Sequence, residues 1–85
     1  MGYSIVFARR ALRDLKSLSA VDQTRVAKRI DALAQNPRPH GSKKLQASED
    51  LYRIRSGDFR VIYSITDREL LVLVIRIGNR RDIYG

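Results

Sequence analysis

Residues 51–60 read Leu51-Tyr-Arg-Ile-Arg-Ser-Gly-Asp-Phe-Arg60, two short runs in which apolar and polar side chains alternate. Such alternation is typical of β-strands, and Gly57-Asp58 between the runs is typical of a hairpin turn. Because successive side chains in a strand point to opposite faces, any two-residue loop here leaves Arg53, Arg55 and Arg60 on one side of the sheet. Like charges on one face repel, so the pattern favours a face that binds an anion, phosphate above all. A solvated face with scattered charges is the plain alternative.

Three strands are predicted in the second half of the chain, over residues 51–55, 59–66 and 69–77. The unbroken apolar run 70–75 is typical of a central strand that is covered on both faces. In the middle strand, one set of alternating side chains is expected to meet the helices, which leaves Arg60 on the open side. This set is Phe59, Val61, Tyr63 and Ile65. Thr66-Asp67-Arg68 supplies the turn between the last two strands.

The first half of the chain predicts one strand and two helices. Tyr3, Ile5 and Phe7 alternate with polar or smaller residues, as in a short strand. The apolar faces of the helices are Ala11, Leu12, Leu15 and Leu18 in the first, and Val26, Ala27, Ile30, Leu33 and Ala34 in the second. Ser19, three residues before Asp22, predicts the start of the second helix, and Asn36-Pro37 predicts its end. Residues 38–44 have no periodicity and are expected to form a basic loop.

This order of elements predicts an α+β fold: a strand, a helical hairpin, then three strands, with the two helices packed on one face of a mainly antiparallel sheet. A chain of 85 residues is the size of a single domain, here residues 1–85. Its 44% of hydrophobic residues is enough for a packed core.

The charge of the chain restricts its partners. The formal net charge is +8 and the pI is about 10.6. Such a field favours nucleic acid or an acidic protein as the partner. No apolar run approaches the roughly 20 residues of a spanning helix, so no membrane association is expected. The absence of cysteine excludes disulfides and thiolate chemistry and fits a reducing cytoplasm.

The residues available for chemistry exclude several mechanisms. His40 is the only histidine, so a histidine pair of the ordinary ribonuclease type is excluded, and its loop context favours a structural or exposed role. The carboxylates are scattered without motif spacing, so neither a metal nor a cofactor is expected. RNA can be cleaved by its own 2′-hydroxyl, and preorganised cations stabilise the charge that builds on the phosphoryl oxygens. Arg55, Arg60 and Arg80 suit that task.

Two segments taken together resemble a known family. They are Leu51-Tyr-Arg-Ile-Arg with Gly-Asp-Phe-Arg-Val-Ile-Tyr63, and Ile77-Gly-Asn-Arg-Arg-Asp-Ile-Tyr84. Their order and spacing closely resemble the RelE-like toxins of the RelE/ParE superfamily, and the resemblance covers nearly the whole chain. It implies the RelE-like fold, metal-independent cleavage of messenger RNA in the ribosomal decoding site, and neutralisation by an antitoxin. The +8 charge makes an acidic antitoxin the expected partner, beside the ribosome and its message.

The resemblance assigns roles to individual positions. Arg60 matches the family arginine that stabilises the scissile phosphate, and Arg80 the arginine that assists the leaving oxygen. Tyr84 matches the terminal tyrosine that stacks on or orients the RNA, although a terminal aromatic also packs on sheet edges. Arg53 and Arg55 fall where well-studied messenger-RNA cleavers carry lysines, and Asn79 where many relatives have histidine.

These departures matter for proton transfer, because arginine effectively never loses its proton in a protein whereas lysine does when its pKa is depressed. Lys43 or Lys44 is then nearer to the role of general base, or the step depends on electrostatics alone. The residues expected to bind RNA are Arg53, Lys43, Lys44 and Arg81, with Arg81 and Asp82 as a local ion pair the alternative. The residues expected to act in catalysis are Arg60, Arg80, Tyr84 and Arg55.

Two rival functions remain open from the sequence. The ParE branch of the superfamily shares the fold but poisons DNA gyrase, which would make the chain a protein inhibitor without nuclease activity. A nucleic-acid-binding module without catalysis would be compatible with the basic charge alone. The cleaving branch is favoured by the joint presence of Arg60, Arg80 and Tyr84.

Overall fold

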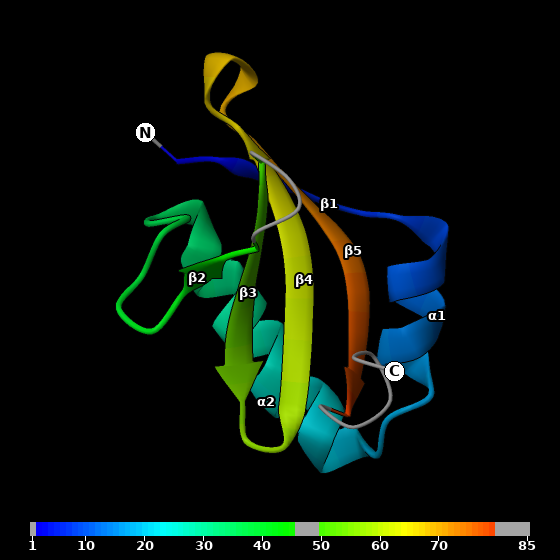
Figure 1. Ribbon diagram of the computed structural model, residues 1–85. Helices are drawn as coiled ribbons and strands as arrows, with labels where there is room; N and C mark the ends of the chain where they lie inside the picture. Colours follow the sequence, from blue (N-terminus) through cyan, green and yellow to red (C-terminus); the bar gives the residue numbers. More distant parts are fainter. Residues whose placement is uncertain (1, 46–49, 80–85) are drawn as a thin grey trace.

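The computed structural model describes residues 2–45 and 50–79, which form five strands and two α-helices (Figure 1). The elements, in chain order, are β1 (Ser4–Phe7), α1 (Arg9–Lys16), α2 (Ala20–Asp31), the 3-10 turn η1 (Ala32–Ala34), β2 (Lys43–Lys44), β3 (Leu51–Ser56), β4 (Phe59–Thr66), the 3-10 turn η2 (Asp67–Glu69) and β5 (Leu71–Asn79). No helix in the described part of the chain is long and apolar enough to cross a membrane.

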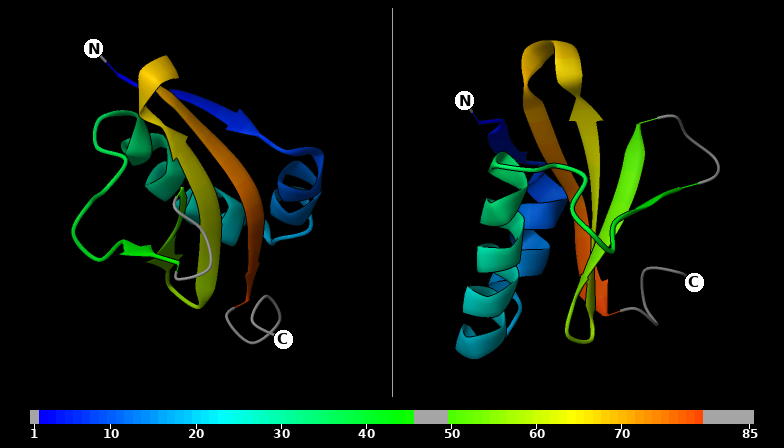
Figure 2. Two further views of the ribbon diagram at one scale, coloured as in Figure 1. Left: turned by 45° about the horizontal axis from the view of Figure 1, so that its top comes forward. Right: turned by 90° about the vertical axis from the view of Figure 1, so that its left-hand side faces the viewer.

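The strands form one mixed sheet in the order β1-β5-β4-β3-β2. β1 runs parallel to β5, and the other neighbours are antiparallel. Both helices lie on the same face of this sheet, as the right-hand view of Figure 2 shows, and no helix of residues 2–45 and 50–79 lies on the other face. The predicted α+β architecture is therefore confirmed.

The hairpin predicted from residues 51–60 has the expected loop. Ser56 and Phe59 are the last cross-strand pair, so Gly57 and Asp58 are the two loop residues. Gly57 has a φ of +60°, and Leu70 is the only non-glycine residue with positive φ among those described. A glycine with positive φ at the first loop position is what a type II′ turn requires, and this turn matches the twist of the strands.

The core lies between the helices and the sheet. Tyr63 is its largest fully buried side chain, surrounded by aliphatic residues from both layers. The expected helix-facing residues of β4 are confirmed, since Val61, Tyr63 and Ile65 are buried and Phe59 packs against them. The expected face of α1 is wrong at Leu12, which is 41% exposed. Ala11 and Leu15 follow the helical spacing of four residues, Leu18 packs on the core just beyond the end of α1, and Leu12 is turned about 100° away from Ala11.

β5 is flanked by β1 and β4, as expected of a central strand, but it is not covered on both faces. Val72, Val74 and Ile77 are buried under the helices, whereas Leu71, Leu73 and Ile75 are only half-buried on the other face. A register shift between Ile62 and Tyr63 leaves Ile75 as an extra residue in β5. This bulge changes which side chains point inward, so the buried positions pass from even to odd numbers.

The ends of several elements differ from the predictions. α2 begins after Ser19, whose hydroxyl accepts the Asp22 backbone N–H at 3.2 Å, as the sequence predicted. The helix ends at Asp31 and continues as the η1 turn, before Asn36 and Pro37. β5 starts two residues later than predicted because η2 and a left-handed Leu70 complete the turn.

The segment predicted as a basic loop contains a short strand. β2 adds Lys43 and Lys44 to the edge of the sheet, opposite Arg53 and Tyr52. The preceding loop is held by Arg38, which donates two hydrogen bonds to Asp67 (3.2 and 2.9 Å) and one to the Tyr52 hydroxyl (3.0 Å). These bonds hold the pKa of Asp67 below its usual range. They also explain why a segment without hydrophobic periodicity has a defined path.

Candidate functional site

Four cations of β2, β3 and β4 share the sheet face on which no described helix lies. Residues that pair across strands point to the same face, and here Lys43 pairs with Arg53 while Arg55 pairs with Arg60. Arg53 and Arg55 are two apart in β3 and therefore also share a face. We call Lys43, Arg53, Arg55 and Arg60 the basic face. The prediction that the three hairpin arginines lie on one side of the sheet is confirmed, and Lys43 joins them.

Each cross-strand pair of the basic face joins two positive charges. Like charges directly opposite each other destabilise a sheet. Lys43, Arg53 and Arg55 form no ion pair within the described part of the chain. Guanidinium groups match phosphate oxygens with two parallel hydrogen bonds, so a phosphate would convert this repulsion into attraction. The geometry is therefore that of an anion-binding surface.

A cavity of about 350 Å³ opens at the edge of the basic face. It is lined by Arg29, Gly41, Lys43, Arg53 and Arg55. Arg29 reaches this edge from α2, and its Nε donates to the backbone carbonyl of Arg55 at 3.3 Å. β2 pairs only with Tyr52 and Arg53 of β3, so the Arg55 carbonyl has no strand beside it on that edge, and the bond from Arg29 gives this carbonyl a donor. Arg29 was not predicted as a site residue, because only the tertiary fold brings α2 to the edge of β3.

Arg60 lies in the middle of the sheet, between Arg55 on β3 and Gly78 on β5. Its Nε atom is buried, whereas Arg55 is exposed. Gly78 carries no side chain on that face. A partly buried cation is screened less by water than an exposed one, so Arg60 is the member of the basic face best placed to act on a bound phosphate.

The structure separates some of the predicted residues. Lys44 pairs with Tyr52, whose ring stacks on the buried Tyr63 on the helix side, so Lys44 points away from the basic face. The predicted residues Arg80, Arg81 and Tyr84 lie outside the described residues. The described chain ends at Asn79, opposite Phe59. His40 is exposed in the loop before β2, and no group of three or more metal-ligating side chains occurs within residues 2–45 and 50–79.

Asp14 is a structural residue that the sequence did not reveal. The β1 ladder on β5 ends at Phe7 and Val74, which leaves the next edge N–H groups of β5 without a strand. Asp14, 14% exposed on α1, accepts the Ile77 backbone N–H at 3.0 Å and the Arg76 Nε at 3.1 Å. It therefore replaces a strand at the point where β5 approaches Arg60. No local pattern distinguishes Asp14 from a surface carboxylate.

We expect Asp14→Ala to lower the free energy of unfolding by about 2 kcal/mol, because it removes the acceptor of two charge-assisted hydrogen bonds. Urea unfolding followed by circular dichroism measures this change. Asp31→Ala is the matched control, since Asp31 is exposed and its side chain makes no hydrogen bond or ion pair with the described residues. A midpoint for Asp14→Ala equal to that of the control would show that Asp14 does not anchor β5.

Comparison with known proteins agrees with this architecture. The family model described as "ParE toxin of type II toxin-antitoxin system, parDE" matches residues 5–84. A "Putative RelE-like toxin protein" of Escherichia coli is 32% identical over 89 residues, covering 100% of this chain and 93% of its own. The "mRNA interferase toxin RelE" of Escherichia coli K12 is 30% identical with the same coverage.

Solved structures show the same fold. The archaeal RelE–RelB complex from Pyrococcus horikoshii OT3 contains a chain with a TM-score of 0.84 and 29% identity, covering 96% of this chain and 99% of that one. A chain of the RelBE2 toxin–antitoxin complex from Mycobacterium tuberculosis has a TM-score of 0.83 and 26% identity, covering 94% of this chain and 100% of that one. Fold, basic face and relatives together define a toxin of a type II toxin–antitoxin system. The chain belongs to the RelE/ParE family.

Proposed function

We propose that this toxin is a ribosome-dependent endoribonuclease that cuts messenger RNA in the decoding site. The observation that carries the proposal is the basic face, with two like-charged pairs beside a cavity of about 350 Å³. A surface of this kind stabilises the extra negative charge on a phosphate under attack. Two of the relatives at 30% identity bear the name mRNA interferase, which supports the same reading. The target would place the protein in the cytoplasm.

In this mechanism the RNA supplies its own nucleophile, the 2′-hydroxyl, which attacks the adjacent phosphorus and leaves a cyclic phosphate. Arg60 and Arg55 hold the phosphoryl oxygens as their charge increases. Arg80 assists the departing oxygen and Tyr84 stacks on a base, roles that come from the family resemblance. Stacking on an aromatic ring contributes roughly 1–3 kcal/mol per base.

The proton of the 2′-hydroxyl needs an acceptor. Arg53 and Arg55 do not serve, because a guanidinium stays protonated. Lys43 is the one lysine of the basic face and becomes our candidate base, whereas Lys44 points to the opposite face and is retained only as an RNA contact, together with Arg53 and Arg81. Without a strong base, the protein depends on the ribosome to hold the message in the geometry of attack. Such orientation contributes several kcal/mol to catalysis.

The decisive experiment adds the purified toxin to ribosomes programmed with a defined message and maps the cuts. We expect metal-independent cleavage on ribosomes and little cleavage of the same RNA when it is free. Cleavage ends should carry a 2′,3′-cyclic phosphate. Efficient cutting of naked RNA would contradict the dependence on the ribosome.

A gyrase-directed toxin is the second candidate, because the family model that matches the chain is named for ParE. A supercoiling assay with purified gyrase, run beside the ribosome assay, separates the two functions. Inhibition of supercoiling with intact message would establish the gyrase function. A toxin that binds RNA without cutting it, and without effect on gyrase, would be the non-catalytic module.

We further propose an acidic antitoxin as the partner, because the solved relatives include toxins in complex with RelB and because this chain carries +8. Association between opposite charges is fast at low salt and slows as salt screens the charges. Stopped-flow mixing with the antitoxin at increasing salt measures this dependence. An association rate that does not change with salt would contradict the electrostatic basis of the proposal.

A further inference from the structure

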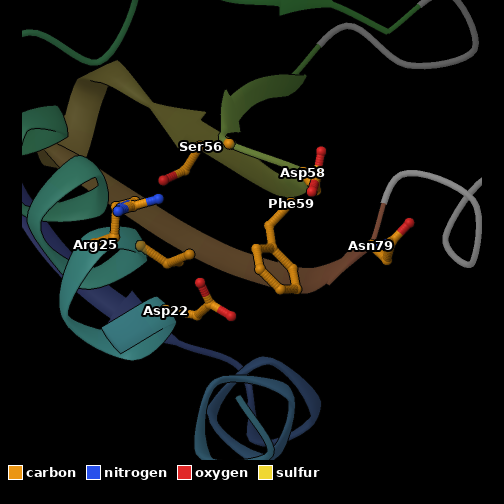
Figure 3. Close-up of a pocket in the computed structure, with 8 residues that line it drawn as sticks. Asp22, Arg25, Ser56, Asp58, Phe59 and Asn79 are labelled. Carbon is orange, nitrogen blue, oxygen red and sulfur yellow. The ribbon is translucent and has the colours of Figure 1, made fainter. Parts of the chain in front are cut away.

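A second cavity, of about 210 Å³, lies on the helix side of the sheet, away from the basic face. It is enclosed between the first turns of α2, the β3–β4 turn and the end of β5 (Figure 3). The lining includes Asp22 and Arg25 from α2, Ser56 and Phe59 from the hairpin, and Asn79 from β5. Since a water molecule takes about 30 Å³ in the liquid, the space is larger than a single water molecule or small ion requires.

Ser56 indicates that this cavity is made for a polar ligand. The residue is only 8% exposed, and its side chain points into the cavity (Figure 3). Its hydroxyl makes no hydrogen bond with another described residue, and its oxygen is not among the fully buried unpaired atoms, so it is accessible from the cavity. The side chains of Asp22 and Arg25 likewise form no ion pair or hydrogen bond within the described part of the chain. Three polar groups of different character therefore surround one space.

The charge of the lining argues against phosphate. Asp22 and Arg25 bring one carboxylate and one guanidinium to the space, whereas Figure 3 shows the Asp58 carboxylate pointing away from it, so the lining has no net positive charge although the whole chain carries +8. A carboxylate only accepts hydrogen bonds, so a ligand bound to Asp22 must carry hydrogen-bond donors. A guanidinium only donates, so the same ligand must also carry acceptors for Arg25. The Phe59 ring projects from the sheet toward Asp22 and offers an aromatic wall (Figure 3).

We propose that this cavity binds a guanine base of single-stranded RNA. Guanine presents two adjacent donors, N1–H and the N2 amino group, to the two oxygens of Asp22. Its O6 and N7 are acceptors, which an arginine reads with two bonds. Adenine and cytosine each place a ring acceptor beside their one amino group, so one oxygen of the carboxylate would face a lone pair. Unpaired bases of single strands expose these edges and stack on aromatic rings.

The guanine site is close to the basic face along the chain. Ser56 directly follows Arg55, and Phe59 directly precedes Arg60. Because side chains alternate along a strand, Ser56 and Phe59 point to the face of the sheet opposite to the two arginines. A strand of RNA that crosses the end of the hairpin would thus place a phosphate on one face and a base in the cavity on the other. The site is a binding site and does not require cleavage, so it stands apart from the proposed nuclease function.

Nuclear magnetic resonance titration of the full chain with GMP, AMP and CMP tests the site. The three nucleotides carry the same phosphate, so a difference between them reports on the base. We expect GMP to bind more tightly than AMP and CMP and to shift the amide signals of Asp22, Ser56 and Phe59. We expect Asp22→Asn to weaken GMP binding about tenfold, because one charge-assisted pair of hydrogen bonds is lost. The preference for GMP over AMP and CMP should disappear with it. Ser56→Ala should weaken GMP binding with the fold unchanged.

Asp31→Asn is the matched control, because Asp31 ends the same helix and lies outside the cavity. It should bind GMP as the unsubstituted protein does. Equal binding of the three nucleotides, with shifts confined to Arg55 and Arg60, would overturn the proposal and leave only phosphate binding. Shifts at the cavity with putrescine in place of GMP would mark a cation site, and shifts only with the antitoxin would mark a protein contact. Either result would also overturn it.

Discussion

Replacing Arg60 with alanine is expected to slow message cleavage on the ribosome by about 100- to 1000-fold, the usual effect of removing one preorganised donor from a charged transition state. Arg60 lies between Arg55 and Gly78 with its Nε buried, so no neighbour on β4 replaces its charge at that point of the sheet. Single-turnover cleavage of ribosome-bound message measures the chemical step separately from product release.

Arg68→Ala is the matched control for this substitution. Arg68 is an exposed arginine of η2 and is separated from Arg60 by the length of β4, so its loss should leave cleavage unchanged. Circular dichroism must show that both variants are folded. Near-normal cleavage by a folded Arg60→Ala protein would exclude the proposed site, and continued toxicity of that variant in cells would favour the gyrase-directed function.

Arg55→Lys in the same assay tests whether the reaction is limited by the lack of a general base for the 2′-hydroxyl proton. It introduces the lysine that the family resemblance implies at this position, directly opposite Arg60. If a titratable amine limits the rate, cleavage should increase and rise with pH. An unchanged rate would indicate that transition-state electrostatics, and not proton transfer to this position, limits the reaction.

Tyr63→Ala is expected to have the largest effect on the fold, with a loss of about 3–5 kcal/mol in the free energy of unfolding. Tyr63 is fully buried and stacks on Tyr52 with 6.0 Å between ring centroids. Its hydroxyl donates to the Pro37 carbonyl at 2.7 Å. Because small domains are stable by only about 5–15 kcal/mol, this substitution should remove a large share of the protein's stability. Urea unfolding gives the value directly.

Tyr63→Phe is the control that separates packing from the hydrogen bond. It keeps the ring and should cost about 1–2 kcal/mol, because the buried Pro37 carbonyl loses its donor. Equal losses for the two variants would show that the hydrogen bond, and not the ring, determines the stability of this region.

The hydroxyl of Tyr63 also predicts a pH dependence. Burial raises its pKa from 10.0 to about 12, so the folded state holds the proton more tightly than the unfolded state. The stability that this proton provides is complete below pH 10 and is lost as the pH rises from 10 toward 12. The difference in unfolding free energy between Tyr63→Phe and the unsubstituted protein should therefore shrink over that range, whatever other groups titrate there.

Local patterns in the sequence determined much of the architecture. Gly57 predicted the hairpin because positive φ is costly for other residues at that loop position. Alternation along β3 and β4 predicted which face carries Arg53, Arg55 and Arg60, since the strand period is two. Ser19 predicted the start of α2 because its hydroxyl satisfies a backbone N–H that the helix leaves open. Each of these signals depends on residues that are near neighbours in the chain.

The tertiary structure decided the features that join distant residues. Lys43 and Lys44 are adjacent in sequence, yet pairing with β3 brings one to the basic face and turns the other away. The bulge at Ile75 changes which side chains of β5 point inward, and no local pattern indicates it. Asp14 lies 63 residues from Ile77, whose backbone N–H it accepts, and the cavity around Ser56 combines α2 with the β3–β4 turn and the end of β5. Such contacts depend on the packing of helices against strands, which is set by the shape of the whole core rather than by the period of any one segment.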